Sequence, residues 1–183
     1  MRRILVLTAL LAFHGANASD FDNTKALAEQ GETWAQFRVG SWITSAGVVG
    51  SYNRADFRYQ NYKPNTSIGF YTNQSCDFIN IDHVVSLKDA HDNGAASWSP
   101  DKRQSFANDR ANHVASCGRV KSSKGAAGPK DFLGRSNDGK GLEYEIVRFC
   151  EYVEKYHAVK TKYDLSFGSN DEAIFTGCGV AIK

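Results

Sequence analysis

Two adjacent residues, Asp82 and His83, have the side chains that hydrolysis of a phosphodiester bond requires. A histidine has an unperturbed pKa near neutrality and can act as a general base, and an aspartate is a hard oxygen ligand for Mg²⁺ or Mn²⁺. The pair interrupts an apolar stretch, Phe78 to Leu87, whose mostly β-branched residues predict a buried strand. Because neighbouring strand residues face opposite sides, both can serve one site only if the strand ends or twists there.

The segment that follows supplies groups that could bind phosphate. Between residues 102 and 130 only Asp109 is acidic, whereas seven residues are basic: Lys102, Arg103, Arg110, Arg119, Lys121, Lys124 and Lys130. Phosphate contact requires such a local excess of positive charge, although clustered lysines also form ordinary solvated faces. Charge alone therefore leaves both interpretations open.

Asp82 and His83 begin a series of motif residues that stand in a specific order. The series is Asp82-His83-Val84-Val85, Gly94-Ala95, Trp98, Phe106-Ala107-Asn108-Asp109, Asn112 and Ser123-Lys124-Gly125. In order and spacing this series closely resembles the HNH (His-Me finger) nucleases, which include the C-terminal domains of modification-dependent restriction enzymes and many small secreted bacterial nucleases. The resemblance covers roughly Tyr52 to Cys178. It implies an α+β fold with a ββα-metal core and additional helices.

The resemblance also implies roles for individual residues. His83 would be the general base, Asp82 a metal ligand, and Asn112 the residue that fixes either the loop or the imidazole. Lys124 would contact phosphate or the developing charge, and Arg103 and Arg119 could bind phosphate as well. The implied reaction is endonucleolytic hydrolysis of DNA, with RNA as the alternative substrate, assisted by Mg²⁺ or Mn²⁺. We expect a monomer.

Three positions depart from the family pattern. Ser86 stands where proline is usual and His113 where an apolar residue is usual, whereas Lys121 replaces the metal-binding asparagine. An ammonium cannot coordinate a cation, and beside a helix N-terminus it adds unfavourable positive charge. Three interpretations remain: Asp82 holds the cation with His113 or waters, Lys121 itself does part of the cation's electrostatic work, or the enzyme is impaired. In the last case the chain would be a secreted binding module on an HNH scaffold.

The N-terminal residues predict export. Arg2 and Arg3 precede an apolar run from Ile4 to Phe13 and a small-residue end at residues 16–18, which is the pattern of a cleavable signal peptide over residues 1–18. The apolar run is too short to cross a bilayer, so we expect no membrane anchor and a secreted or periplasmic protein. Residues 19–183 are predicted to form a single domain. Without the signal its basic and acidic residues balance, at 20 of each.

Four cysteines in an exported chain predict two disulfides: Cys76, Cys117, Cys150 and Cys178. Three pairings are possible in principle. The predicted elements favour Cys76 with Cys117, at the two predicted strands, and Cys150 with Cys178, which would fix the C-terminal tail.

Five further elements are predicted around the motif. Ser99 and Pro100 are typical of a helix start and predict a short helix toward Asn108. The remaining predictions are a helix over 23–37, a strand over 113–120, a helix within 122–133 and a long amphipathic helix over 142–163.

Overall fold

A computed structural model of the chain describes residues 51–168, 170 and 172–182. The chain divides into two units, Met1–Val49 and Gly50–Lys183, and all described residues belong to the second. The predicted signal peptide and the predicted helix over 23–37 lie outside the described residues. The second unit combines helices with one small antiparallel sheet, so its α+β class is as predicted. Among the described residues, no helix combines the length and the apolarity needed to cross a membrane.

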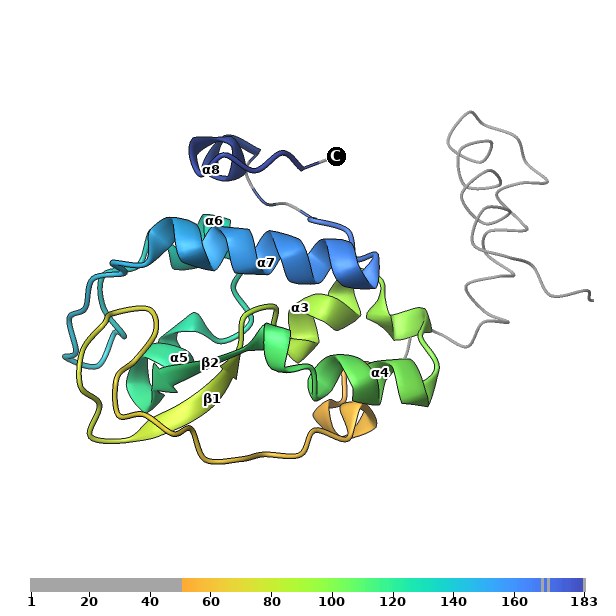
Figure 1. The fold of residues 1–183 in the computed structure, drawn as a ribbon, viewed down its shortest axis with the longest axis horizontal. Helices are drawn as coiled ribbons and strands as arrows, with labels where there is room; N and C mark the ends of the chain where they lie inside the picture. The colour runs from red at the N-terminus through yellow and green to blue at the C-terminus, as the bar shows by residue number, and fades with distance from the viewer. Residues whose placement is uncertain (1–50, 169, 171, 183) are drawn as a thin grey trace, which may run out of the picture. The chain divides into compact units, whose positions relative to one another are not determined.

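The described elements follow one another along the chain as shown in Figure 1. In order they are η1 (Arg54–Phe57), β1 (Ile79–His83), α3 (Leu87–Asp92), η2 (Ala95–Ser97), α4 (Pro100–Ala107), η3 (Arg110–Asn112), β2 (His113–Cys117), α5 (Gly118–Lys124), α6 (Pro129–Phe132), α7 (Phe149–Tyr163) and α8 (Glu172–Gly177). β1 and β2 pair antiparallel, with Ile79 opposite Cys117 and His83 opposite His113. α5 follows β2 directly and packs against both strands.

The first strand is shorter than the sequence predicts. β1 ends at His83 because the backbone N–H groups of the next two residues are bound by Asn112: Val84 donates to its carbonyl oxygen and Val85 to its side-chain Oδ1, both at 2.8 Å. Ser86 then caps α3, its side chain accepting from Asp89 N at 2.9 Å. The strand therefore ends directly after the Asp-His pair, as a shared site requires.

The region after β2 also differs from the prediction. The strand expected over 113–120 ends at Cys117, and Val120 is buried on α5 instead. The helix expected within 122–133 is two short helices, α5 and α6. Gly125, with φ of 55°, ends the first, because this left-handed conformation suits glycine. By contrast, α4 begins at Pro100 behind its Ser99 cap, as predicted.

The long C-terminal helix begins later than its apolar spacing predicts. α7 starts at Phe149, because the preceding segment makes backbone hydrogen bonds to distant residues: Tyr144 N donates to Ser136 O at 2.8 Å and Val147 N to Tyr71 O at 3.0 Å. Within α7 the buried positions recur at three- and four-residue steps, as an amphipathic helix requires. They are Tyr152, Val153, Tyr156, Val159 and Lys160.

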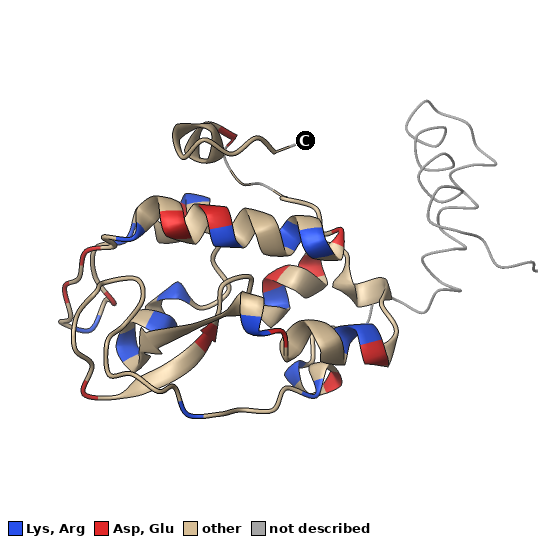
Figure 2. Cartoon of the chain, viewed as in Figure 1, with Lys and Arg blue, Asp and Glu red and all other residues tan. Residues whose placement is uncertain are grey.

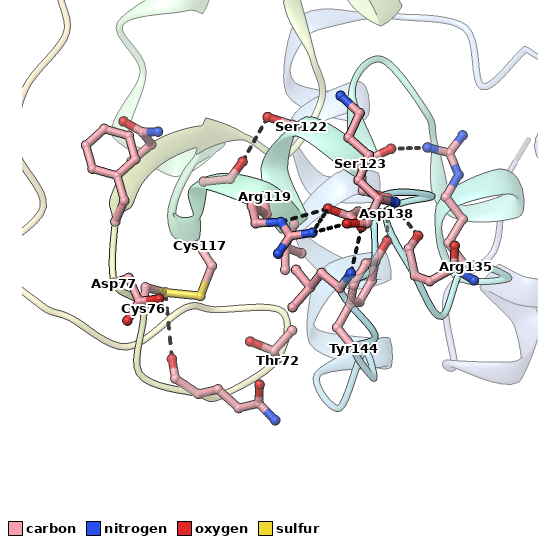
Figure 3. Close-up of a pocket in the computed structure, with 18 of the residues that line it drawn as sticks. Thr72, Cys76, Asp77, Cys117, Arg119, Ser122, Ser123, Arg135, Asp138 and Tyr144 are labelled. Atoms are coloured by element: carbon pink, nitrogen blue, oxygen red, sulfur yellow. Dashed lines mark hydrogen bonds and ion pairs between the residues drawn. A yellow bond between two sulfur atoms is a disulfide. The ribbon is translucent and has the colours of Figure 1, made fainter.

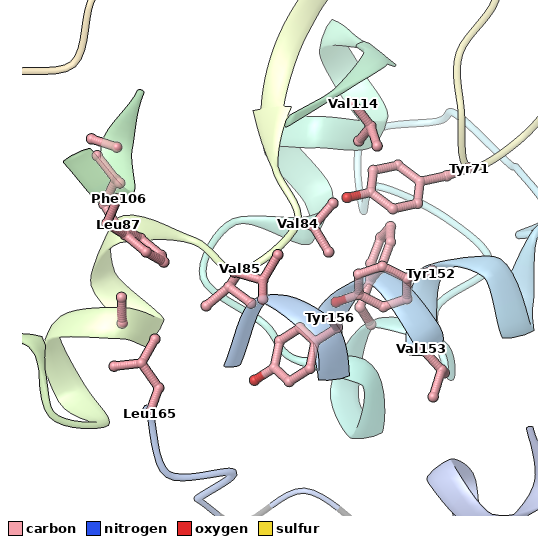
Figure 4. Close-up of a cluster of buried hydrophobic side chains, with 14 of the residues drawn as sticks. Tyr71, Val84, Val85, Leu87, Phe106, Val114, Tyr152, Val153, Tyr156 and Leu165 are labelled. Atoms are coloured by element: carbon pink, nitrogen blue, oxygen red, sulfur yellow. The ribbon is translucent and has the colours of Figure 1, made fainter. Parts of the chain in front are cut away.

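The hydrophobic core lies between the strands and α7. Figure 4 shows Val84, Val85 and Val114 from the strand region facing Tyr71, Tyr152 and Tyr156. All six are buried, and edge-to-face ring contacts join Tyr71 to Tyr152 and Phe132. This core holds the end of β1, and therefore the Asp-His pair, against the longest helix.

Both disulfides have the pairing that the sequence favoured. Cys76 bonds Cys117 and Cys150 bonds Cys178. The first links the segment before β1 to the residue immediately before α5. It also packs on Gly69, where an added Cβ would lie only 2.9 Å from Cys117 Sγ, so a larger residue there would displace the bridge.

Candidate active site

His83 is the end residue of β1 and is held in a defined orientation. Its Nε2 lies 2.8 Å from the carbonyl oxygen of Ala107, at the end of α4. A carbonyl oxygen only accepts hydrogen bonds, so Nε2 must be the nitrogen that bears the proton. Nδ1 of the neutral ring then has a free lone pair, and in the described part of the chain it makes no hydrogen bond. This is the tautomer that a general base requires.

Burial keeps the His83 ring neutral. The residue is 4% exposed, and this burial lowers its pKa to about 3, opposed only by the hydrogen bond to Ala107. The ring of Tyr59 lies edge-to-face at 4.6 Å between centroids and covers one side. The ring of His113 lies at the same distance, 4.6 Å, and His83 is also one of the residues that line a pocket at the protein surface.

The pocket beside His83, here called the His83 pocket, has a volume of about 270 Å³ and is mainly positive. Its charged lining residues are Arg54, Lys88 and Lys121 against Asp82. Lys121 is half-buried and donates from Nζ to the carbonyl oxygen of Ile81 at 2.7 Å, which fixes its ammonium. Burial lowers the pKa of Lys121, partly offset by the charge of Asp82. The pocket is thus suited to an anion.

Asp82 and Lys124 form a buried ion pair next to this pocket. Lys124 Nζ lies 3.1 Å from Asp82 Oδ2 and donates to the carbonyl oxygen of His83 at 2.8 Å. The same Oδ2 accepts from the hydroxyl of Tyr71 at 2.7 Å. The Lys124 side chain is completely buried and does not line the pocket, so its predicted contact with phosphate or the developing charge stays a prediction. Its place is behind the site, where it fixes the backbone of His83.

Asn112 fixes the loop and not the imidazole. Its side-chain Oδ1 accepts from Val85 N at 2.8 Å, and its Nδ2 donates to Val85 O at 3.0 Å. The sequence had left these two possibilities open. Together with its backbone bond to Val84, Asn112 joins the end of β1 to the start of β2, which sets the position of His83.

His113 lies directly opposite His83, and its Nε2 contacts the same Ala107 carbonyl oxygen at 3.0 Å. The two rings are 4.6 Å apart between centroids, and Tyr62 contacts His113 Nδ1 at 3.3 Å. Asp82 pairs instead with Val114 in the strand register. Because neighbouring residues face opposite sides of a strand, His113 shares the face of His83, whereas the Asp82 carboxylate is bound by Tyr71 and Lys124 at the edge of the His83 pocket.

These donors do not fit a divalent cation in the arrangement observed. The Asp82 carboxylate is ion-paired with Lys124, both imidazoles bind a carbonyl group, and the ammonium of Lys121 lines the same pocket. Among the described residues, no group of three or more His, Cys, Asp or Glu side chains converges. We therefore derive no chemical step through a metal, and the Mg²⁺ or Mn²⁺ cofactor stays a prediction.

The two predicted phosphate-binding arginines lie apart from the His83 pocket. Arg103 donates to the carbonyl oxygens of Ala95 and Ala96, at 3.1 and 2.6 Å, and so fixes the chain before α4. Arg119 lines a second, larger pocket. The sequence missed Arg54, since nothing in its local pattern connects it with His83.

Comparison with known proteins adds one relative. The chain is 36% identical over 100 residues to an uncharacterized secreted protein of Arthroderma benhamiae, a match that covers 54% of the chain and 45% of that relative. The chain thus spans less than half the length of this relative. No family model and no solved structure matches. The resemblance to HNH nucleases accordingly rests on the motif residues alone.

Proposed function

We propose that this protein hydrolyses phosphodiester bonds in nucleic acid at the His83 pocket, with Nδ1 of His83 taking the proton of the attacking water. The central observation is a buried, neutral imidazole whose Nε2 proton is committed to Ala107 while the ring borders a positive pocket. Such a ring is already unprotonated at neutral pH, but a general base works best when its pKa lies near the working pH, so the low pKa of His83 would have to rise beside the anionic phosphate of the substrate.

Cationic side chains would stabilise the negative charge that develops on the phosphate. The ammonium of Lys121, already fixed by Ile81, could do part of the electrostatic work that the family assigns to a cation. Arg54 and Lys88 are exposed on the same pocket and could bind the phosphates on either side of the scissile bond. The chain's own residues would thus bind and orient the strand, and His83 would move the proton.

The order of elements supports the same proposal. A strand ending in His83, an antiparallel partner strand and a helix directly after it are the parts that the ββα-metal core of the HNH nucleases implies. In addition, Asn112 fixes the segment after His83, one of the two roles that the resemblance implies for it. We therefore propose an HNH-type architecture with an altered cation site.

Secretion belongs to the proposal as well. Two disulfides persist in oxidising compartments outside the cytosol. The relative from Arthroderma benhamiae is also described as secreted. An exported enzyme of this kind would meet nucleic acid outside the cell that made it.

The decisive experiment uses the full-length oxidised protein with supercoiled DNA and, separately, with RNA, in Mg²⁺ and in excess EDTA. His83→Ala should reduce cleavage on the order of a hundredfold or more, because the general base is lost. His157→Ala is the matched control. Because His157 does not line the pocket, this variant should cleave like the wild type. Equal cleavage by wild type and His83→Ala would refute the base assignment.

EDTA and Lys121 together test the role of the cation. Cleavage that persists in EDTA and falls in Lys121→Asn would mean that the lysine replaces the cation. Cleavage abolished by EDTA would establish the predicted metal requirement.

A second candidate function is a binding module that has lost catalysis. Lys121 in the pocket and the Asp82–Lys124 ion pair favour it, because both oppose binding of a divalent cation. A large gain of cleavage in Lys121→Asn with Mg²⁺ would identify the natural protein as impaired.

A further inference from the structure

A second and larger pocket lies on the other side of α5. It has a volume of about 920 Å³ and is bordered by the start of β1, by α5 and by the segment 135–144. Figure 3 shows Arg119, Ser122 and Ser123 of α5 on one side, with Arg135, Asp138 and Tyr144 beside them. Ser122 also lines the His83 pocket, so the two pockets meet at this residue. A chain molecule bound at His83 could continue into this second pocket, here called the α5 pocket.

The α5 pocket contains an exposed aromatic ring. Phe78 is 68% exposed, more than any other large apolar side chain among the described residues. Its backbone is fixed, because Gly118 N donates to Phe78 O at 2.8 Å. A Cβ added at Gly118 would lie 3.0 Å from Phe78 Cδ1, so the ring rests against the glycine backbone. The backbone of Phe78 is therefore fixed before any ligand binds, and most of the surface of its ring is exposed to solvent.

Positively charged side chains line the same pocket. Arg119, Arg135 and Lys140 line the pocket against Asp77 and Asp138. Asp138 is already bound by Arg119, whose Nε donates to it at 2.8 Å and whose terminal nitrogen donates to Lys140 O at 2.9 Å. Arg135 donates to the carbonyl oxygen of Ser123 on α5. The guanidinium groups of Arg119 and Arg135 are thus held on the pocket wall, that of Arg119 in an ion pair with Asp138.

We propose that the α5 pocket binds an unpaired nucleotide of the substrate strand, with its base stacked on Phe78 and its phosphates near Arg119 and Lys140. This inference rests on the proposed function and specifies its substrate class. An aromatic ring flanked by cations is the combination with which proteins bind single-stranded nucleic acid. A base inside a duplex has both faces covered by its neighbours and would first have to leave the stack. The substrate is therefore single-stranded nucleic acid or an unpaired stretch.

Binding without cleavage tests this proposal. A fluorescein-labelled twelve-residue oligodeoxythymidine is titrated in EDTA with the full-length oxidised His83→Ala protein, and fluorescence anisotropy gives the dissociation constant. Adding Phe78→Ala should weaken binding by about fivefold to a hundredfold, the usual range for loss of one stacked base. Phe78→Trp should preserve binding. Phe149→Ala is the matched control, because Phe149 is exposed but lies outside the pocket lining.

The possible failures are distinguishable. If Phe78→Ala binds the oligonucleotide as tightly as the protein with Phe78, and its thermal unfolding is unchanged, the stacking site would be overturned. The proposed nuclease would be left intact. Binding of a duplex of the same length as tightly as the single strand would also overturn it. No binding of the oligonucleotide by any variant would overturn the α5 pocket proposal, whereas the cleavage assay with supercoiled DNA and with RNA decides separately whether the protein is a nuclease.

Discussion

Two ion pairs are buried among the described residues, and they differ in what lies beside them. In each, the lysine side chain is fully buried and the aspartate nearly so: Lys124 with Asp82, and Lys160 with Asp89. Lys160 joins α7 to α3, where Asp89 also accepts from Tyr156 at 2.8 Å. Lys124 joins α5 to β1 and donates to the backbone of His83. The same interaction therefore supports the scaffold in one region and orients the proposed base in the other.

The largest effect is expected at the pair beside the site. Lys124→Met leaves the Asp82 carboxylate buried without its partner, which should cost about 3–5 kcal/mol of unfolding free energy. Cleavage per folded molecule should also fall, on the order of tenfold to a hundredfold, because the backbone of His83 loses a hydrogen bond that positions it. Urea unfolding and plasmid cleavage at matched folded concentration measure the two effects.

The double variant Lys124→Met with Asp82→Asn is the control. Its stability should partly return, and its cleavage should not. Recovery of both would show that Lys124 acts through stability alone.

The scaffold pair should show the stability effect alone. Lys160→Met should also destabilise the protein by about 3–5 kcal/mol, since Asp89 is left buried and charged. Cleavage per folded molecule should stay within about twofold of the wild type. In the described structure the Lys160 ammonium donates hydrogen bonds to Asp89 and to the carbonyl oxygen of Ser166, and neither of these residues contacts His83. The same two assays apply. A selective loss of cleavage would mean that the two regions are coupled and that the comparison does not hold.

Acid should destabilise the protein through the two histidines at the site. Burial lowers the pKa of His83 to about 3 and lowers that of His113, so between pH 6.5 and about 3 the unfolded chain binds more protons than the folded one. The stabilisation is complete above pH 6.5 and is lost as the pH falls, by about 1.4 kcal/mol per pH unit for each histidine involved. The free energy of unfolding, measured with urea from pH 7 to pH 5, should depend less on pH in His83→Asn than in the wild type. An unchanged slope would contradict the burial of a neutral His83.

The sequence predicted short-range features well and long-range ones poorly. The Ser99 cap of α4 follows from local chemistry, and the disulfide pairing follows from the order of the predicted elements; the structure agrees with both. The burial of Lys124 could not be predicted, because its partners are about forty residues away in the chain. Leu87 fitted the apolar pattern of the strand but belongs to α3, since a distant asparagine determines where the strand ends.

The candidate site shows the same division. The motif located His83, Asp82 and Asn112. One of the three interpretations left open paired Asp82 with His113 or waters around the cation, but the strand register puts these two residues on different faces. Arg54 and Phe78 have no motif of their own. Their relation to the site depends on how η1 and the start of β1 pack, which spacing along the chain does not reveal.

The bridge between Cys76 and Cys117 has a consequence for the cell that makes the protein. It joins the segment before β1 to the residue from which α5 begins, and both cysteines line the α5 pocket. In a thiol-rich cytosol this bridge would stay open, and the pocket wall would lack its covalent link. If the α5 pocket binds the substrate strand as proposed, a newly made chain would complete this pocket only in an oxidising compartment.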